Sequence, residues 1–320
     1  MNDTSPGRDK APVAVIGAGL VGRAWAIVFA RAGHPVALFD ADPDALQRSL
    51  AALDAGIAEL AGAGLLAGSP ASVRLRITPA PTLAAAVAGA AYVQENISEN
   101  LAAKSALFAE LDRLAPPGTI LASSTSTIPA SAWSAGLAGR ARCLVAHPVN
   151  PPHLVPVVEL SPAPWTDPAV VDRAKALQES IGQVPIVLKR EIQGFIINRL
   201  QGALLAEAFR LHADGYVSAD DIDKCVRDGL GLRWSFMGPF ETIDLNAPGG
   251  IADYCVRYRG PYYEMAQQQL PRQWDDASIA SLEAERRALL PADALAERGA
   301  WRDRRLMQLV AHKRRAADED

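Results

Sequence analysis

The chain has 320 residues, of which 49% are hydrophobic and 21% charged, and its formal net charge is −4. This composition supports a large buried core and excludes an intrinsically disordered polymer. The slightly acidic balance provides no broad positive field for nucleic acid, and we expect the basic run of Lys313, Arg314 and Arg315 to be a solvated helix end. A chain of this length is expected to fold as two domains.

The cysteines and the N-terminus bear on where the protein resides. Cys143, Cys225 and Cys255 lie far apart and match neither a metal-binding nor a disulfide pattern, which is typical of a reducing compartment. Residues 1–10 are expected to be a flexible tail without the apolar segment of a signal peptide, and no apolar stretch approaches about 18 residues. We therefore expect a cytoplasmic protein with no metal site and no membrane partner.

The first predicted domain covers residues 11–190. The β-branched run at 13–16 predicts a buried strand, the Ala-rich segment 22–32 a helix, and 36–39 a second strand. Helices are expected over roughly 43–68, and further strands at 73–77, 90–94, 119–123, 142–146, 155–160 and 184–188. Strands that alternate with helices predict a Rossmann-type α/β fold, with a doubly wound and mostly parallel sheet.

From about residue 191 the apolar spacing becomes helical, beginning with Phe195, Ile196 and Leu200. Ser218 and Asp221 fit a capping box at the start of an amphipathic helix. We therefore predict an all-helical second domain over residues 191–320.

A G-x-G-x-x-G segment leaves the first strand and enters the first helix, and its members are Gly17, Gly19, Leu20, Val21 and Gly22. In that context the backbone amides can approach a pyrophosphate at the positive end of a helix. Asp40 ends the second strand, where a ribose-binding acid is expected, and no arginine immediately follows it to receive a 2′-phosphate. The pattern favours NAD over NADP, while FAD shares the same fingerprint.

Polar residues follow the predicted strands at the edge where ligands of parallel sheets bind. One loop carries the hydroxyls of residues 123–127, and His147 opens the proline-rich loop that contains Asn150. Glu159 interrupts an apolar run, so its carboxylate needs a partner such as His147. A neutral imidazole can remove the proton of an alcohol during hydride transfer, and a carboxylate on its far nitrogen can orient it.

Ser126 and Asn198 are candidates for orienting the reacting oxygen. Each of these four residues also has a purely structural interpretation: His147 as core, Ser126 as a helix cap, Glu159 as the partner of an arginine, and Asn198 as an interdomain hydrogen bond. The spacing alone leaves these alternatives open.

With these residues the sequence resembles the L-3-hydroxyacyl-CoA dehydrogenase superfamily, and more closely its lambda-crystallin and L-gulonate 3-dehydrogenase branch. The resemblance covers nearly the whole chain and rests on Gly17 to Gly22, Val93 to Glu95, Glu99 to Leu101, Lys104, Ser123 to Ser126, His147 to Pro152, Glu159, Gly194 to Arg199 and Asp228 to Arg233. It implies that His147 is the acid/base paired with Glu159, and that Ser126 and Asn198 contact the substrate oxygen.

The resemblance further implies that Glu99 and Lys104 lie near the cofactor and that the helical domain mediates homodimerisation. From the residues alone, Glu99 and Lys104 can equally be a surface pair on a helix. We also expect Asn150 to contact the substrate. Arg233, in a Gly-rich stretch, is a candidate clamp for a substrate carboxylate, with an interhelical salt bridge as its alternative.

The substrate is expected to be a small 3-hydroxy acid, with L-gulonate preferred. The fatty-acyl enzymes carry a lysine-rich helical pair for CoA, whereas residues 43–70 of this chain contain Arg48 as their only cation, which disfavours a CoA thioester such as 3-hydroxybutyryl-CoA. Carnitine dehydrogenase is another alternative, because the run from Gly231 to Gly238 also resembles it. Its Trp234 and Phe236 can supply part of an aromatic box for a quaternary ammonium, although we expect both in the core. A structural, crystallin-like role is the non-enzymatic alternative.

Overall fold

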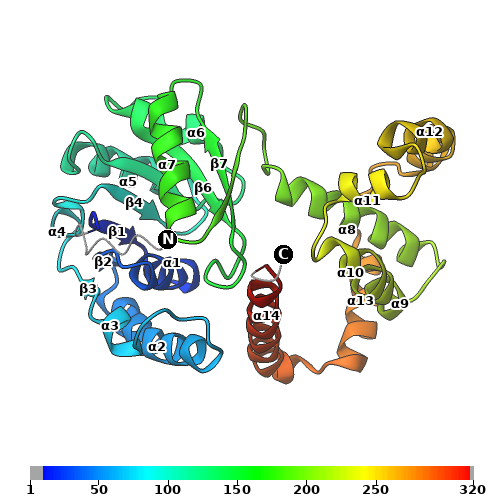
Figure 1. Cartoon of the computed structure of the whole chain (residues 1–320), viewed down its shortest axis with the longest axis horizontal. Coiled ribbons are helices and arrows are strands. Elements are labelled where there is room, and N and C mark those ends of the chain that lie inside the picture. Colours follow the sequence, from blue (N-terminus) through cyan, green and yellow to red (C-terminus); the bar gives the residue numbers. More distant parts are fainter. Residues whose placement is uncertain (1–9, 318–320) are drawn as a thin grey trace. The chain divides into compact units, whose positions relative to one another are not determined.

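A computed structural model describes residues 10–317, so the expected tail lies, apart from Lys10, outside the described residues. The chain divides into two compact units (Figure 1). The first unit runs to Asn198 and resumes at Ala300, and the second unit is Arg199–Gly299. The domain boundary expected at residue 191 stays a prediction; by contacts the helical unit begins at Arg199, and the chain from Ala300 onward groups with the first unit.

The first unit is built on an eight-stranded sheet in the order β3-β2-β1-β4-β5-β6-β7-β8. All neighbouring strands pair in parallel except β6 and β7, which are antiparallel. The expected Rossmann-type, mostly parallel sheet is therefore confirmed. The strands are β1 Val13–Ile16, β2 Val36–Phe39, β3 Ile77–Pro79, β4 Tyr92–Glu95, β5 Ile120–Ser123, β6 Cys143–Pro148, β7 Val157–Pro162 and β8 Val184–Val187.

Helices cover both faces of this sheet, which explains why its central strands are apolar at consecutive positions. In β1, Val13 and Val15 pack into one core with Trp25 and Phe29, whereas Ala14 and Ile16 face the other. The first core contains residues of α1 Leu20–Arg31, α2 Pro43–Gly62, α3 Pro70–Arg74 and α7 Pro168–Ser180. The second contains residues of α4 Leu83–Val87, α5 Leu101–Leu114 and α6 Ala130–Ser134.

The strand predicted at 73–77 is wrong. Residues Pro70–Arg74 form helix α3, and strand β3 begins only at Ile77. The Ser69 hydroxyl accepts a hydrogen bond from the Ser72 backbone amide, and Pro70 occupies the first helical turn. This helix start outweighs the weak apolar pattern of the segment. The preceding helix α2 ends at Gly62, ahead of the expected residue 68.

The second unit is helical, as expected. Ser218 accepts from the Asp221 amide and donates to its carboxylate, so the predicted cap is confirmed. Trp234 and Phe236, however, are 41% and 71% exposed and do not pack in a core. Its helices are α8 Ile197–Ala213, which starts in the first unit, α9 Ala219–Lys224, the π-helical η2 Cys225–Leu230, α10 Gly231–Trp234, α11 Pro239–Leu245, α12 Gly250–Gln268 and α13 Asp276–Leu289.

The last helix, α14 Leu295–Ala317, enters the first unit at Ala300. Met307 is buried in the core beside α1 and α2, and Leu306 and Val310 pack against it. Within residues 10–317, no helix has the length and apolarity needed to cross a bilayer. Over the same residues, no cluster of three or more His, Cys, Asp or Glu side chains is arranged to hold a metal ion.

Candidate active site

The glycine-rich turn between β1 and α1 is shaped by close backbone contacts. A Cβ atom on Gly17, which has a φ of +89°, would lie 2.8 Å from the Asn96 backbone, and one on Gly22 would lie 1.8 Å from the Gly17 carbonyl oxygen. A Cβ on Gly19 would meet nothing within 4 Å. The first and third glycines therefore close the turn, while the second leaves open space. The turn fits the pyrophosphate of a dinucleotide at the start of α1.

Asp40 follows β2 beside this turn. Its Oδ2 accepts a hydrogen bond of 2.7 Å from the Ala18 amide, and its Oδ1 accepts one of 2.9 Å from the Asp42 amide. The carboxylate is thereby fixed next to the glycine-rich turn, in the position expected for an acid that binds a cofactor ribose.

His147 and Glu159 meet because β6 and β7 pair in antiparallel register with these two residues opposite each other. The imidazole Nδ1 lies 2.8 Å from Glu159 Oε2, and Glu159 is fully buried. With Nδ1–H donating to the carboxylate, the Nε2 of a neutral imidazole carries the lone pair. The predicted pairing is thus present, and the proton-accepting nitrogen is the one that faces away from Glu159.

A strained turn before α8 supports this pair. Phe195 has a φ of +52°, is fully buried, and its ring centroid lies 5.3 Å from that of His147. The amides of Ile196 and Ile197, which follow it, donate to Glu159 Oε1 at 2.7 and 3.0 Å. A bulky residue in the left-handed region is rare and is typical of functional sites. Phe195 was expected at helical spacing and within the segment Gly194 to Arg199 that carries the resemblance, but its positive φ was not predicted, and the one sequence signal for the turn is Gly194.

Ser126 and Asn198 are brought together, as expected. The Asn198 side-chain amide donates to the Ser126 backbone oxygen at 2.8 Å. Glu99 holds the same loop, because its Oε1 accepts from the amides of Ser126 and Thr127 and from the Thr125 hydroxyl. Burial alone would raise the pKa of Glu99, but these hydrogen bonds and the Lys104 charge hold it below its ordinary value.

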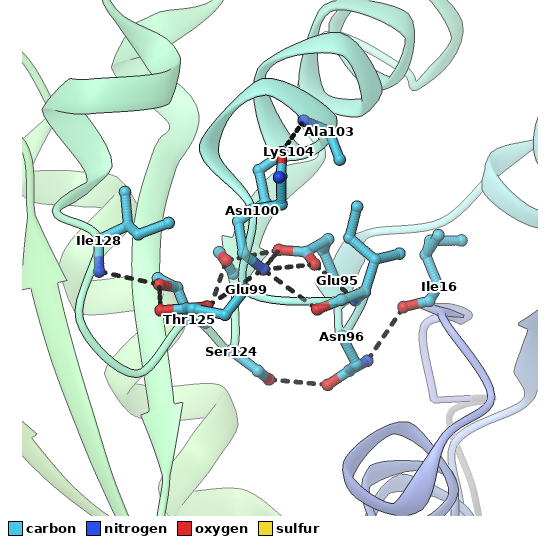
Figure 2. A network of polar contacts seen from close by, with 12 residues as sticks. Ile16, Glu95, Asn96, Glu99, Asn100, Ala103, Lys104, Ser124, Thr125 and Ile128 are labelled. Atoms are coloured by element: carbon cyan, nitrogen blue, oxygen red, sulfur yellow. Dashed lines mark hydrogen bonds and ion pairs between the residues drawn. The ribbon is translucent and has the colours of Figure 1, made fainter.

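Lys104 forms a buried ion pair beneath this loop (Figure 2). Its Nζ lies 2.8 and 3.0 Å from the two carboxylate oxygens of Glu95 and 3.8 Å from Glu99. The side chains of Lys104 and Glu95 are 1% and 0% exposed. Lys104 therefore links Glu95 to Glu99, while contacts of Glu99 and Lys104 with the cofactor stay predictions.

Polar residues at the end of β4 join the cofactor turn to the hydroxyl loop. The Ser124 hydroxyl accepts from Gln94 at 2.7 Å. It donates to Asn96 Oδ1 at 2.7 Å (Figure 2). Asn96 in turn donates to the Ile16 carbonyl just before the turn. No role was predicted for Gln94 or Asn96, although polar residues at the end of a buried strand were an available signal.

The remaining two predicted residues lie in different units. Asn150 is in the loop after β6, three residues beyond His147, in the first unit. Arg233 is exposed on α10 in the second unit. Their assignments to substrate binding stay predictions.

Together, a dinucleotide turn, a carboxylate-oriented imidazole and an adjacent Ser–Asn pair are the parts of an NAD-dependent dehydrogenase that acts on a hydroxyl group. The chain matches "3-hydroxyacyl-CoA dehydrogenase, NAD binding domain" over residues 12–192 and "3-hydroxyacyl-CoA dehydrogenase, C-terminal domain" over residues 194–285. It belongs to the 3-hydroxyacyl-CoA dehydrogenase family, which confirms the resemblance and the use of NAD.

Similar proteins differ in the substrates that their names give. The chain is 46% identical over 316 residues to the lambda-crystallin homolog of Bos taurus, covering 97% of this chain and 98% of that protein. It is 36% identical over 313 residues to L-carnitine dehydrogenase of Streptomyces coelicolor, covering 96% of each. A solved 5-formyl-3-hydroxy-2-methylpyridine 4-carboxylic acid 5-dehydrogenase superposes with a TM-score of 0.79 at 28% identity, covering 95% of this chain and 97% of that one.

Proposed function

We propose that the protein oxidises the 3-hydroxyl of a small, free 3-hydroxy acid, and that L-gulonate is its substrate. The observation that carries this proposal is the buried His147–Glu159 pair beside Ser126 and Asn198, on a domain whose second helix lacks a cationic surface. NAD, when bound, accepts the hydride from the carbinol carbon.

The side chains divide the remaining work. His147 Nε2 accepts the proton of the substrate hydroxyl, and the Glu159 carboxylate stabilises the imidazolium that forms. Ser126 and Asn198 orient the reacting oxygen, and Glu99 keeps their loop in place through its contacts with the backbone. The buried position of Glu159 favours a fixed imidazole orientation, because its other oxygen is already occupied by two amides.

A CoA thioester is the main alternative, and the charge of α2 argues against it. Arg48 is the one cation of this helix, its side chain is 70% exposed, and it lies 3.4 Å from the Asp42 carboxylate. The phosphates of CoA need several cations or oriented amides. Carnitine is favoured only by the similarity to L-carnitine dehydrogenase and by the exposure of Trp234 and Phe236, two rings that can contact a quaternary ammonium.

The test is NADH formation by the purified protein with NAD and, separately, L-gulonate, L-carnitine, 3-hydroxybutyrate and L-3-hydroxybutyryl-CoA, compared by kcat/KM. We expect L-gulonate to have the highest value. A preference for the thioester would overturn the interpretation of α2, and a preference for carnitine would make the exposed rings of α10 the next target. No turnover of any of the four would favour the structural role.

We further propose that the protein is a cytoplasmic homodimer that pairs through its second unit. The absence of disulfides among the three cysteines, all free thiols, is consistent with a reducing compartment. Large apolar side chains are exposed across the second unit and are candidates for burial against a second copy. They include Leu232, Phe236, Phe240, Leu245, Val256, Tyr263 and Leu270.

Light scattering after size exclusion tests the dimer. We expect the unaltered protein to have twice the mass of one chain, and Phe240→Asp to shift it toward the monomer. Leu75 is an exposed leucine of the first unit, so Leu75→Asp is the matched control and should leave the mass unchanged. A monomeric unaltered protein at micromolar concentration would contradict the proposal.

A further inference from the structure

A pocket of about 320 Å³ lies within the first unit, separate from the residues assigned above except for Asn150 and Leu20. Its walls come from α1, α2, the loop after β6, and the C-terminal helix α14. Its polar lining residues are Arg23, Glu59, Asn150, His153, Arg302 and Asp303, and its apolar lining residues include Leu20, Ala24 and Ile27.

Arg23 is the unusual residue of this pocket. It sits one turn into α1, directly after the glycine-rich turn, and is partly buried. Its guanidinium forms no hydrogen bond or ion pair with any residue between positions 10 and 317, whereas the other pocket cation, Arg302, pairs with Asp303 at 2.7 Å. A partly buried arginine that pairs with none of these residues has its guanidinium available to pair with a bound anion. It is therefore a candidate for binding an anion.

The rest of the lining is neutral or acidic, and it restricts which anion fits. Burial, followed by the charge of Arg31, lowers the pKa of His153 to about 4, so its imidazole is neutral at physiological pH. His153 Nδ1 is buried without a hydrogen-bond partner among the described residues. A neutral imidazole and the Asn150 amide suit hydroxyl groups. Glu59 and the already paired Asp303 would oppose a second negative charge.

The pocket has the size of a small-molecule site, and two of its lining residues belong to the candidate active site. A volume of about 320 Å³ is at the lower end of the range of about 300–1,000 Å³ for small-molecule pockets. The pocket is bounded by Leu20 of the cofactor turn and by Asn150, three residues beyond His147. A polyhydroxylated monocarboxylate matches this combination of one free cation, neutral polar groups and small volume.

We propose that this pocket receives the carboxylate end of the substrate, with Arg23 as the cation that binds it and His153 and Asn150 as partners of its hydroxyl groups. The inference rests on the proposed function, since it names the part of the protein that selects a free hydroxy acid. It replaces Arg233 by Arg23 as the residue that recognises the carboxylate. The same guanidinium chemistry would suit a phosphate of NAD, and the experiment separates the two.

The experiment compares Arg23→Gln and Arg23→Lys with the unaltered enzyme, using Arg48→Gln as the matched control on the exposed surface of α2. KM and kcat are measured for L-gulonate, for its uncharged amide and for NAD. We expect Arg23→Gln to raise KM for L-gulonate about 30-fold or more and to leave KM for the amide and for NAD within a factor of about three. Arg23→Lys should restore part of the loss, and Arg48→Gln should behave as the unaltered enzyme.

An unchanged KM for L-gulonate in an active Arg23→Gln enzyme would overturn the inference, and so would a rise confined to NAD. A measurement of L-gulonate binding that needs no turnover distinguishes failure of this inference from failure of the proposed function. L-gulonate should raise the Tm of the unaltered protein in the absence of NAD but not that of Arg23→Gln. If L-gulonate raises the Tm of the unaltered protein but not that of Arg23→Gln, while the protein oxidises none of the four compounds, the pocket assignment is supported and the proposed reaction is contradicted. If L-gulonate neither raises the Tm of the unaltered protein nor is oxidised by it, both the pocket assignment and the proposed reaction are contradicted.

Discussion

The two units of the chain are stabilised in different ways. The first unit buries two layers of apolar side chains against its sheet, including Trp25, Phe29 and Phe108 at 0% exposure. In the second unit four residues are buried, and two of them, His212 and Thr242, are polar; the others are Ala219 and Ala247. The first unit therefore has its own core and carries the candidate chemistry, whereas the second unit exposes the apolar surface that an interface requires.

The variant His147→Ala tests whether the chemistry resides in the first unit. His147→Ala should lower kcat by about 10³-fold, because a positioned acid/base contributes about 10²–10⁴-fold. Fluorescence titration should give an unchanged Kd for NADH, since the glycine-rich turn is untouched. His312→Ala, an exposed histidine of α14, is the control and should retain full activity. If His147→Ala kept its activity, either another base or the structural role would have to be considered.

The next effect concerns the buried ion pair of the first unit. Lys104→Met leaves the Glu95 carboxylate buried with one hydroxyl and one amide as partners, so we expect a loss of about 3–5 kcal/mol in the free energy of unfolding. Urea denaturation measures this loss. The double variant Lys104→Met with Glu95→Leu should recover much of it, because no unpaired charge remains. A single variant as stable as the unaltered protein would mean that the pair is not desolvated.

The apolar core of the first unit also explains which parts of its fold and candidate site could be predicted from the sequence. The sheet was predictable because the strands of the first unit are apolar runs separated by helices. His147 was the expected partner of Glu159 because a buried carboxylate needs one and because the family resemblance implies this pair. Strand β3 was misplaced because a local Ser–Pro helix start prevailed over a short apolar pattern. The position of Phe195 was missed because a positive φ in a bulky residue is imposed by tertiary packing.

The exposure of Trp234 and Phe236 shows a further limit of sequence reasoning. Apolar residues at helical spacing predict burial, but the pattern does not say whether the same chain or another copy provides the covering surface. Arg23 lay inside the predicted cofactor helix and had no motif of its own. Only the packing of α14, more than 270 residues later, turns it into part of a pocket.

A smaller effect is the pH dependence of stability that His153 confers on the first unit. Its pKa is about 4 in the folded chain and about 6.5 in the unfolded chain, so between these values only the unfolded chain binds the proton. Stability should therefore fall as the pH drops from 6.5 to 4, by up to about 3 kcal/mol, and level off below pH 4. His153→Asn should remove this component from the dependence of Tm on pH. An unchanged slope between pH 6.5 and 4 would contradict a neutral, buried His153.

The last variant changes a polar contact of the second unit. His212 Nε2 lies 2.7 Å from Glu285 Oε1, and Glu285 Oε2 accepts from the Ala219 amide, so these contacts connect α8, α9 and α13. Without an apolar core, such polar contacts hold the helices of this unit together. His212→Ala should cost about 1 kcal/mol, the usual net value of one hydrogen bond. Hydrogen exchange should become faster in α9 and α13 and remain unchanged in β1 and β4.

Ser278→Ala is the matched control for this last variant. Within residues 10–317 the Ser278 side chain bonds with Asp275 at the start of α13 and not with α8 or α9, and its backbone amide keeps the cap of α13. It should leave the exchange of both helices unaltered. If His212→Ala also accelerated exchange in the sheet, the two units would unfold together, and the sheet would depend on contacts in the helical unit. Exchange confined to α9 and α13 would instead establish that the core of the first unit is sufficient for its own stability.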